Sequence, residues 1–226
     1  MRNLAILIHL CISLCCFSQK PEQRNALVTV RANVGIPKTV SSKMFRTSFS
    51  GLYEANLSVN LRLFSNVYLG VGYQNTHFQN NKEVFVFYRA KNGTLSYNTR
   101  LLGHGAFVKL GYDKFFSEKG YFSYALNTGL MMNNYLNVNA DTSRYNYPPS
   151  PENFNSIYLQ PEISANFIVE RRLSFSLMLS YTTTFRHFDP KGPRFNQFEE
   201  IRTTRNKYLM TWLCFGVGFN VLLNGK

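Results

Sequence analysis

The sequence predicts an all-β fold: an eight-stranded antiparallel up-and-down transmembrane β-barrel with short periplasmic turns and long extracellular loops. Three observations predict it, namely long segments of alternating apolar and polar residues, the presence of eight such segments, and connections that alternate between short and long. Barrel strands need about 9–11 residues to cross a bilayer, whereas strands of soluble proteins commonly have about 5–6 residues. After the N-terminal segment no run of about 20 apolar residues occurs, so the sequence predicts no spanning helix.

The segment 173–185 shows the alternation clearly. Odd-numbered positions from Leu173 to Phe185 are mostly large and apolar, and even-numbered positions are mostly Ser and Thr. No charged residue lies between Arg172 and Arg186, although the water-facing side of a soluble strand usually carries charge. This strand alone leaves two environments open: a soluble sandwich, or a membrane barrel with lipid outside and a packed polar lumen inside.

The first four segments repeat the pattern. Residues 26–36 and 52–64 alternate apolar positions with Thr, Ser, Asn, Gly and three charged residues. Residues 67–74 and 103–113 direct several glycines inward, which allows the close packing and bending of a narrow barrel.

The last four segments are 121–132, 156–168, 172–185 and 208–223. The first directs Ser123, Ala125, Asn127 and Gly129 to the inside, and the last directs Trp212, Cys214, Gly216, Gly218 and Asn220 there. Pro161 lies within 156–168 and lacks the amide hydrogen that a strand ladder needs, so we expect a bulge there.

The connections favour the barrel over the sandwich. The short ones are 64–66, 115–120 and 169–172, and the long ones are 37–50, 75–100, 134–155 and 187–207. Short turns on one side and long loops on the other are typical of outer-membrane barrels, and an even strand count places both termini on the periplasmic side. Within the second long connection, residues 83–100 predict a hairpin that extends the third and fourth strands.

The chain divides into a secretory signal peptide at 1–18 and an outer-membrane barrel domain at 19–226. Arg2 precedes a short apolar core, and Ser18 precedes the expected cut. A lipoprotein signal is the alternative, since the segment contains three cysteines, but none follows the small residue that lipoprotein processing prefers. Only Cys214 remains in the mature chain, where we expect a small apolar filler facing the lumen.

The charge of the chain predicts an anionic partner. The net charge is +13, and removal of Arg2 leaves 24 basic against 12 acidic residues, or +12. We expect outer-membrane lipids, including lipopolysaccharide, and a membrane protein as partners, and no nucleic acid, since the protein is exported. The alternative interpretation is that the basic loops only keep the chain soluble during transit.

The chain resembles a known protein family in four features. They are Phe-Ser-Gln at 17–19, around the expected signal cut, the eight strands, Gln-Pro-Glu at 160–162 and the closing FGVGFNVLL at 215–223. In these the mature chain resembles the small outer-membrane β-barrel proteins of Bacteroidota-type bacteria, including the PorT-like group. The resemblance implies a barrel in the cell outer membrane. The PorT-like proteins are linked to protein export across that membrane.

The charged residues at inward positions form the candidate site. An eight-stranded barrel has a lumen filled by side chains rather than an open pore. Buried charges require partners, so we expect an interior salt-bridge network, with a proton or ion path as the alternative. Its members are Arg31, Glu54, Arg62, Lys109, Asp113, Glu162 and Arg186.

The sequence predicts a non-enzymatic structural component, or a component of assembly or export, that docks partners through its extracellular loops. We expect no catalytic residue, cofactor or metal. The alternatives are a lipid-modifying hydrolase at the outer rim and a narrow channel. His77, His104 and His187 lie near the predicted rim, and His187 shares a loop with Asp189, but no nucleophile elbow accompanies them.

Overall fold

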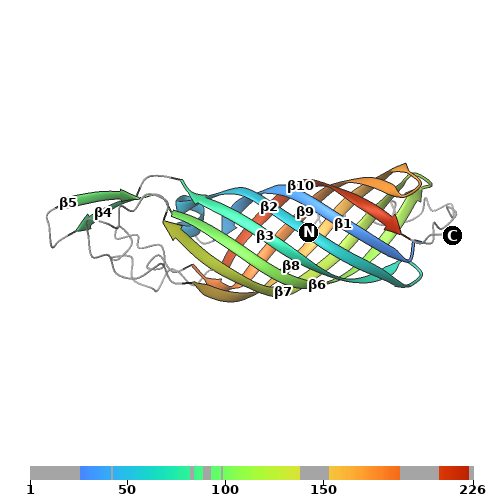
Figure 1. Cartoon of the computed structure of the whole chain (residues 1–226), viewed down its shortest axis with the longest axis horizontal. Coiled ribbons are helices and arrows are strands. Elements are labelled where there is room, and N and C mark those ends of the chain that lie inside the picture. Colours follow the sequence, from blue (N-terminus) through green and yellow to red (C-terminus); the bar gives the residue numbers. More distant parts are fainter. Residues whose placement is uncertain are drawn as a thin grey trace, which may run out of the picture.

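Eight strands close into one antiparallel barrel in the computed structural model, which describes residues 26–41, 43–81, 84–88, 93–97, 99–137, 153–188 and 209–223. The order around the wall is β1-β10-β9-β8-β7-β6-β3-β2, and β1 closes on β10 (Figure 1). The barrel strands are β1 (Val28–Ser41), β2 (Phe49–Phe64), β3 (Val67–Asn80), β6 (Thr99–Ser117), β7 (Gly120–Asn137), β8 (Phe154–Glu170), β9 (Leu173–His187) and β10 (Leu209–Leu223). The predicted fold class and number of barrel strands are confirmed.

The outer face of the wall is apolar and its inner face is mostly polar. Successive residues of a strand point to opposite sides, so in β1 Arg31 and Asn33 are buried, whereas Val34 and Ile36 are 50% and 68% exposed. Phe215 of β10 is likewise 63% exposed. A closed wall pairs its backbone groups internally and can therefore present such an apolar belt to lipid. The chain is an integral membrane barrel of the outer-membrane type.

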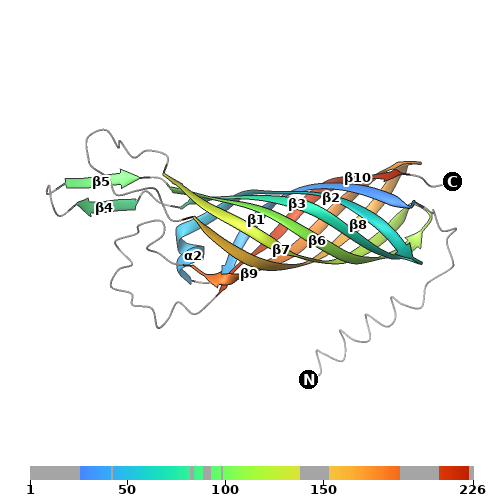
Figure 2. The same cartoon turned by 60° about the horizontal axis from the view of Figure 1, so that its bottom comes forward.

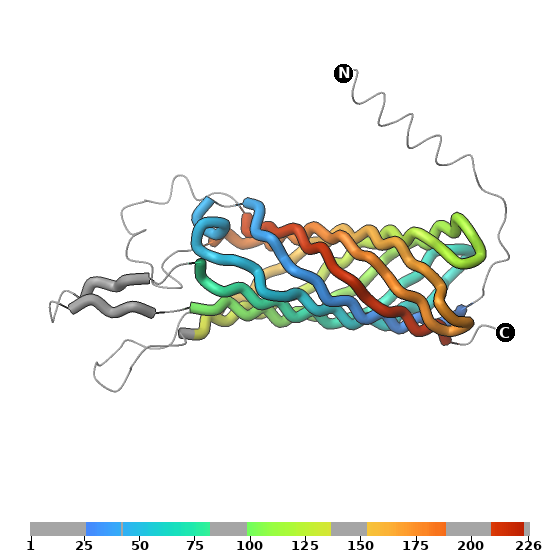
Figure 3. The backbone as a smooth tube through the Cα atoms, turned by 90° about the horizontal axis from the view of Figure 1, so that it is seen from above, coloured from blue at the N-terminus to red at the C-terminus, as the bar shows by residue number. Residues whose placement is uncertain are grey.

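The short turns lie at one end of the barrel. Two-residue turns join β2 to β3, β6 to β7 and β8 to β9, and Ser65 in the first of them adopts a φ of 46°. The start of β1 and the end of β10 lie at this same end (Figure 3), where the amide of Leu222 donates to the carbonyl oxygen of Arg172 in the β8–β9 turn. The start of the first strand and the end of the last strand therefore lie on the short-turn side, as predicted.

The closing seam between β1 and β10 depends on two glycines. Gly35 and Gly216 lie opposite each other in this pair. A Cβ atom at Gly35 would lie 2.6 Å from the carbonyl oxygen of Phe215, and one at Gly216 would lie 2.5 Å from that of Val34. Any side chain at these positions would push the two strands apart.

The long-loop end contains a helix that the sequence did not predict. The connection expected at 37–50 consists instead of the end of β1, helix α2 (Lys43–Ser48) and the start of β2 (Figure 2). The expected loop was too long because β1 continues beyond Ile36 to Ser41, past Pro37 and the outward Lys38, which interrupt the apolar alternation. No helix of the described chain has the length and apolar character needed to cross a membrane.

The hairpin expected at 83–100 is present. Its strands are β4 (Val84–Tyr88) and β5 (Gly93–Tyr97), which pair from Val84 with Tyr97 to Tyr88 with Gly93. They form a two-stranded sheet of their own. The expectation that this hairpin continues the third and fourth barrel strands was therefore wrong.

The bulge expected at Pro161 is absent. Leu159 pairs with Thr183 and Glu162 pairs with Ser180, so the register between β8 and β9 is the same on both sides of the proline. The ladder with β9 is interrupted at the proline, which has no amide hydrogen to donate, while the pairing of Pro161 with Leu126 of β7 continues. The wall thus accepts a proline by losing ladder contacts rather than by inserting a residue.

Candidate functional site in the lumen

A buried ion pair crosses the lumen toward the short-turn end. Arg31 of β1 donates from Nη2 to both carboxylate oxygens of Asp113 of β6, at 3.0 and 3.1 Å. Its Nη1 donates to Tyr68 Oη and to Ser123 Oγ, each at 3.0 Å, and the guanidinium lies 4.4 Å from the centre of the Tyr68 ring. Ser123 also donates to Asp113. Hydrogen bonds thus reach both terminal nitrogens of this cation, as burial requires.

A second buried ion pair lies farther from the short turns. Lys109 Nζ of β6 lies 3.0 and 2.9 Å from the two carboxylate oxygens of Glu162 on β8. Asn127 Nδ2 of β7 donates to Glu162 at 3.1 Å and to Gln160 Oε1 at 2.9 Å. The pair is therefore held by hydrogen bonds from neighbouring strands.

Glu54 connects this pair to the opposite wall. Its carboxylate is fully buried and accepts hydrogen bonds from Trp212 Nε1 at 2.6 Å, Gln160 Nε2 at 2.8 Å and Asn56 Nδ2 at 3.4 Å. These partners are neutral, in contrast to the cations that face Asp113 and Glu162. Gln160 joins Glu54 to the Asn127 side of the network, so one set of hydrogen bonds spans β2, β7, β8 and β10.

Five of the seven expected charges lie in this interior, namely Arg31, Glu54, Lys109, Asp113 and Glu162. The other two, Arg62 and Arg186, are separated from them. Arg62 is half-buried near the β2–β3 turn, and neither buried ion pair includes it. The expectation that Arg186 faces the lumen was wrong, because it is exposed. Its Nη1 donates to the carbonyl oxygen of Asn155 at 3.4 Å, and its guanidinium lies 4.9 Å from the Phe154 ring centre. The alternation continues to Arg186, but at the end of β9 the inward side is no longer enclosed.

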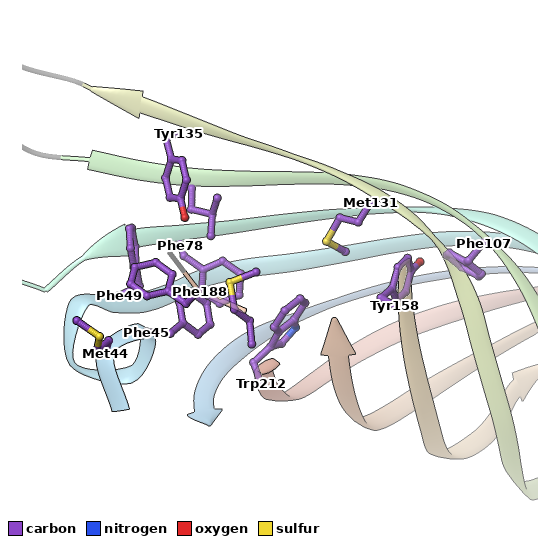
Figure 4. Packing of buried hydrophobic residues seen from close by; sticks show 12 residues of the cluster. Met44, Phe45, Phe49, Phe78, Phe107, Met131, Tyr135, Tyr158, Phe188 and Trp212 are labelled. Carbon is purple, nitrogen blue, oxygen red and sulfur yellow. The ribbon is translucent and has the colours of Figure 1, made fainter. Parts of the chain in front are cut away.

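An aromatic cluster closes the long-loop end of the lumen (Figure 4). Phe45 of α2 is completely buried, and its ring centre lies 5.3 Å from that of Phe78 and 5.6 Å from that of Phe188. Phe78 in turn lies 5.2 Å from Trp212. The full cluster comprises Met44, Phe45, Phe49, Phe78, Leu101, Phe107, Met131, Tyr135, Tyr158, Phe188, Met210 and Trp212. We call it the aromatic cap.

The sequence interpretation missed the aromatic cap. It described the lumen as polar, whereas the end near α2 is apolar. The available signal was the pair Phe45 and Phe49, four residues apart in a segment assigned to a loop. Large aromatic side chains in a connecting segment indicate that the segment packs onto an apolar partner, here with Phe45 on α2 and Phe49 at the start of β2.

The rim histidines do not assemble with an acid and a nucleophile in the described chain. His104 Nδ1 lies 2.6 Å from Tyr73 Oη and 2.9 Å from Asn75 Nδ2, and His77 packs edge-on against Tyr53 with ring centres 5.4 Å apart. His187 is exposed at the end of β9, and Asp189 lies outside the described residues. Within the described ranges no group of three His, Cys, Asp or Glu residues could hold a metal ion. The expected signal peptide at 1–18 also lies outside those ranges.

Cys214 is a buried free thiol on the inner face of β10. This position agrees with the expectation of a small filler in the lumen.

No protein-family model matches the chain, and no curated protein matches it. Among solved structures, Neisserial surface protein A has 15% identity, covers 87% of this chain and 97% of its own, and gives a TM-score of 0.49. The Yersinia pestis attachment invasion locus protein Ail, in complex with the heparin analogue sucrose octasulfate, has 8% identity, covers 85% and 96%, and scores 0.44. A major outer membrane protein from Thermus thermophilus has 11% identity, covers 86% and 97%, and scores 0.44.

The closed eight-stranded wall and its apolar belt, rather than these low scores, carry the assignment. Antiparallel barrels with an even strand number, short turns at one end and an apolar outer band belong to the outer membrane. The chain is an eight-stranded outer-membrane β-barrel.

Proposed function

We propose that the protein is a non-enzymatic structural component, or a component of assembly or export, that docks partners through its long extracellular connections. The observation that supports this is the filled lumen. Two buried ion pairs, Glu54 with its three donors and the aromatic cap occupy the interior in succession. A barrel whose interior is occupied in this way offers its loops and outer wall, rather than a pore, for function.

More specifically, the proposed role is that of the PorT-like group, in protein export across the outer membrane. Support comes from the sequence resemblance, above all Gln-Pro-Glu at 160–162 and the closing segment at 215–223. The two polar residues of the first motif belong to the buried network, since Gln160 donates to Glu54 and Glu162 pairs with Lys109.

Docking through the long connections is tested by co-purification from cells in mild detergent. A chain in which residues 140–151 are replaced by a short Gly-Ser linker should lose a partner that the full chain retains. The matched control replaces Glu118 and Lys119 in the β6–β7 turn and should retain it. Equal recovery of the same proteins by all three chains would reject docking through this loop.

The channel alternative is tested by conductance in planar bilayers. We expect no steady conductance, because eight strands leave no aqueous path and the lumen is filled. A large steady conductance of the purified protein would reject the structural role.

The hydrolase alternative is tested by replacing His77, His104 and His187 singly with alanine and profiling lipid A acylation in cells. We propose that the protein is not an enzyme, so the acylation pattern should not change. Loss of a modification in any one variant would move the protein to the lipid-modifying enzymes.

A further inference from the structure

The outer wall of β3 and β6 carries a polar patch directly beside the apolar belt. These strands are neighbours (Figure 1). Along β3 the outward apolar run from Val67 stops at Tyr73, and along β6 the run from Tyr112 stops at Ala106. On β8, in contrast, outward apolar residues continue from Val169 to Ile157. Toward the long-loop end the outward positions of β3 and β6 are instead Asn75, His77, Gln79, Arg100, Leu102 and His104. We call the five polar members the β3–β6 patch.

Three buried side-chain atoms of the β3–β6 patch have no hydrogen-bond partner among the described residues. Twelve buried side-chain nitrogen and oxygen atoms of the described residues lack a hydrogen-bond partner. Those at outward-facing strand positions are Asn75 Oδ1, His77 Nε2 and Arg100 Nε, and all three belong to this patch. The side chains that carry these atoms are half-buried on the outer wall. Polar side chains on a membrane-facing wall are costly without hydrogen-bond partners, so this concentration points to a ligand that bonds to their exposed atoms.

The described charges at this end of the barrel favour an anionic ligand. The described charged residues toward the long-loop rim are all basic, namely Lys38, Lys43, Arg46, Arg100 and Arg186. The described acids lie in the lumen (Glu54, Asp113 and Glu162) or at the short turns (Glu118 and Glu170). A permanent cation flanked by imidazole and amide groups suits a phosphate.

We propose that the β3–β6 patch binds the phosphate-bearing headgroup of an outer-leaflet lipid. Arg100, His77 and His104 contact the phosphate, and Asn75 and Gln79 bond to the neighbouring polar atoms of the headgroup. The acyl chains lie along the outward apolar residues that continue each strand toward the short turns, such as Val71 and Val108, which are 62% and 47% exposed. The inference rests on the lipid partnership expected for the proposed function and assigns it a place on the wall.

The test measures lipid binding to the full barrel in detergent by native mass spectrometry. The probes are a bis-phosphorylated lipid A, the same lipid with both phosphates removed, and inorganic phosphate alone. The unmodified barrel should bind the phosphorylated lipid about tenfold more tightly than the dephosphorylated one, as expected for charge-assisted hydrogen bonds worth about 1.4 kcal/mol. Equal binding of the two lipids, or equally tight binding of inorganic phosphate, would overturn the proposal.

The variants locate the site. The combination of Arg100→Gln, His77→Gln and His104→Gln should abolish the preference, while Arg100→Lys alone should retain part of it. Arg46→Gln removes the same charge from an exposed position of α2 and should retain the full preference. An unchanged preference in the combined variant, or an equal loss in Arg46→Gln, would overturn the site. Circular dichroism of each variant verifies the barrel, and partner co-purification and conductance report separately on the proposed function.

Discussion

Pairs of charged residues in the lumen join separate parts of the wall. Arg31 with Asp113 and Lys109 with Glu162 join strands that are not neighbours in the wall. Each of these four side chains is almost completely enclosed. Removing one partner leaves the other charge uncompensated, whereas removing both leaves only a packing change.

Lys109→Met should therefore lower the free energy of unfolding by about 3–5 kcal/mol. The double variant Lys109→Met with Glu162→Met should cost clearly less than this single variant, because no buried charge is left unpaired. Urea unfolding in detergent micelles measures both. Lys119→Met, at an exposed turn position, is the control and should change stability by less than about 0.5 kcal/mol. A double variant that is less stable than the single one would contradict the argument.

The residues of the lumen were predictable as a set but not as pairs. Alternation alone assigns Arg31, Lys109 and Glu162 to the inside, because each occupies a position between two outward-facing residues. Which of them meet depends on how far neighbouring strands are shifted along one another, and that shift leaves no trace in a single strand. Arg186 shows the other limit, since alternation does not indicate where the wall ends.

At the scale of elements, α2 acts as an internal closure of the barrel. It is six residues long, too short to be stable without tertiary contacts. Met44 and Phe45 supply those contacts by packing into the aromatic cap. The eight strands were predictable because each carries its own periodic pattern, whereas this helix forms only because the open end of the barrel provides an apolar partner.

Phe45→Ala should destabilise the protein by about 3–5 kcal/mol, because it leaves a cavity at the centre of the aromatic cap. It should not create a steady conductance, because the buried side chains around Lys109 and Glu162 still fill the lumen between the cavity and the short-turn end. Urea unfolding and planar-bilayer recordings measure the two effects. Phe64→Ala is the matched control, because Phe64 is 66% exposed on the outer face and leaves no internal cavity. If Phe45→Ala unfolds like the unmodified protein, the cap does not stabilise the barrel.

At the scale of the whole molecule, the orientation of the two faces of the wall is the feature that determines location. Leu57, Leu177 and Phe215 lie on three different strands and are 54%, 38% and 63% exposed. Their neighbours Ser58 and Ser176 are buried in the lumen. One wall thus separates a lipid environment from a packed interior.

Cysteine labelling in membranes tests this orientation. In a Cys214→Ser background, Leu57→Cys, Leu177→Cys and Phe215→Cys should react with a lipid-soluble thiol reagent and resist a water-soluble one. Ser150→Cys and Asn196→Cys, in the long connections, should react with the water-soluble reagent added to intact cells. Ready labelling of the three wall positions from water would show that the belt does not face lipid.

The position of Trp212 has a practical consequence. It is the only tryptophan of the 226 residues. It lies on the last strand, but its indole nitrogen contacts Glu54 of β2 and its ring contacts Phe78 of β3. These contacts require β10 to have met β1, so they form only when the wall has become a ring. The chain therefore carries an intrinsic optical probe, and the emission of one indole reports barrel closure in real time without any added dye.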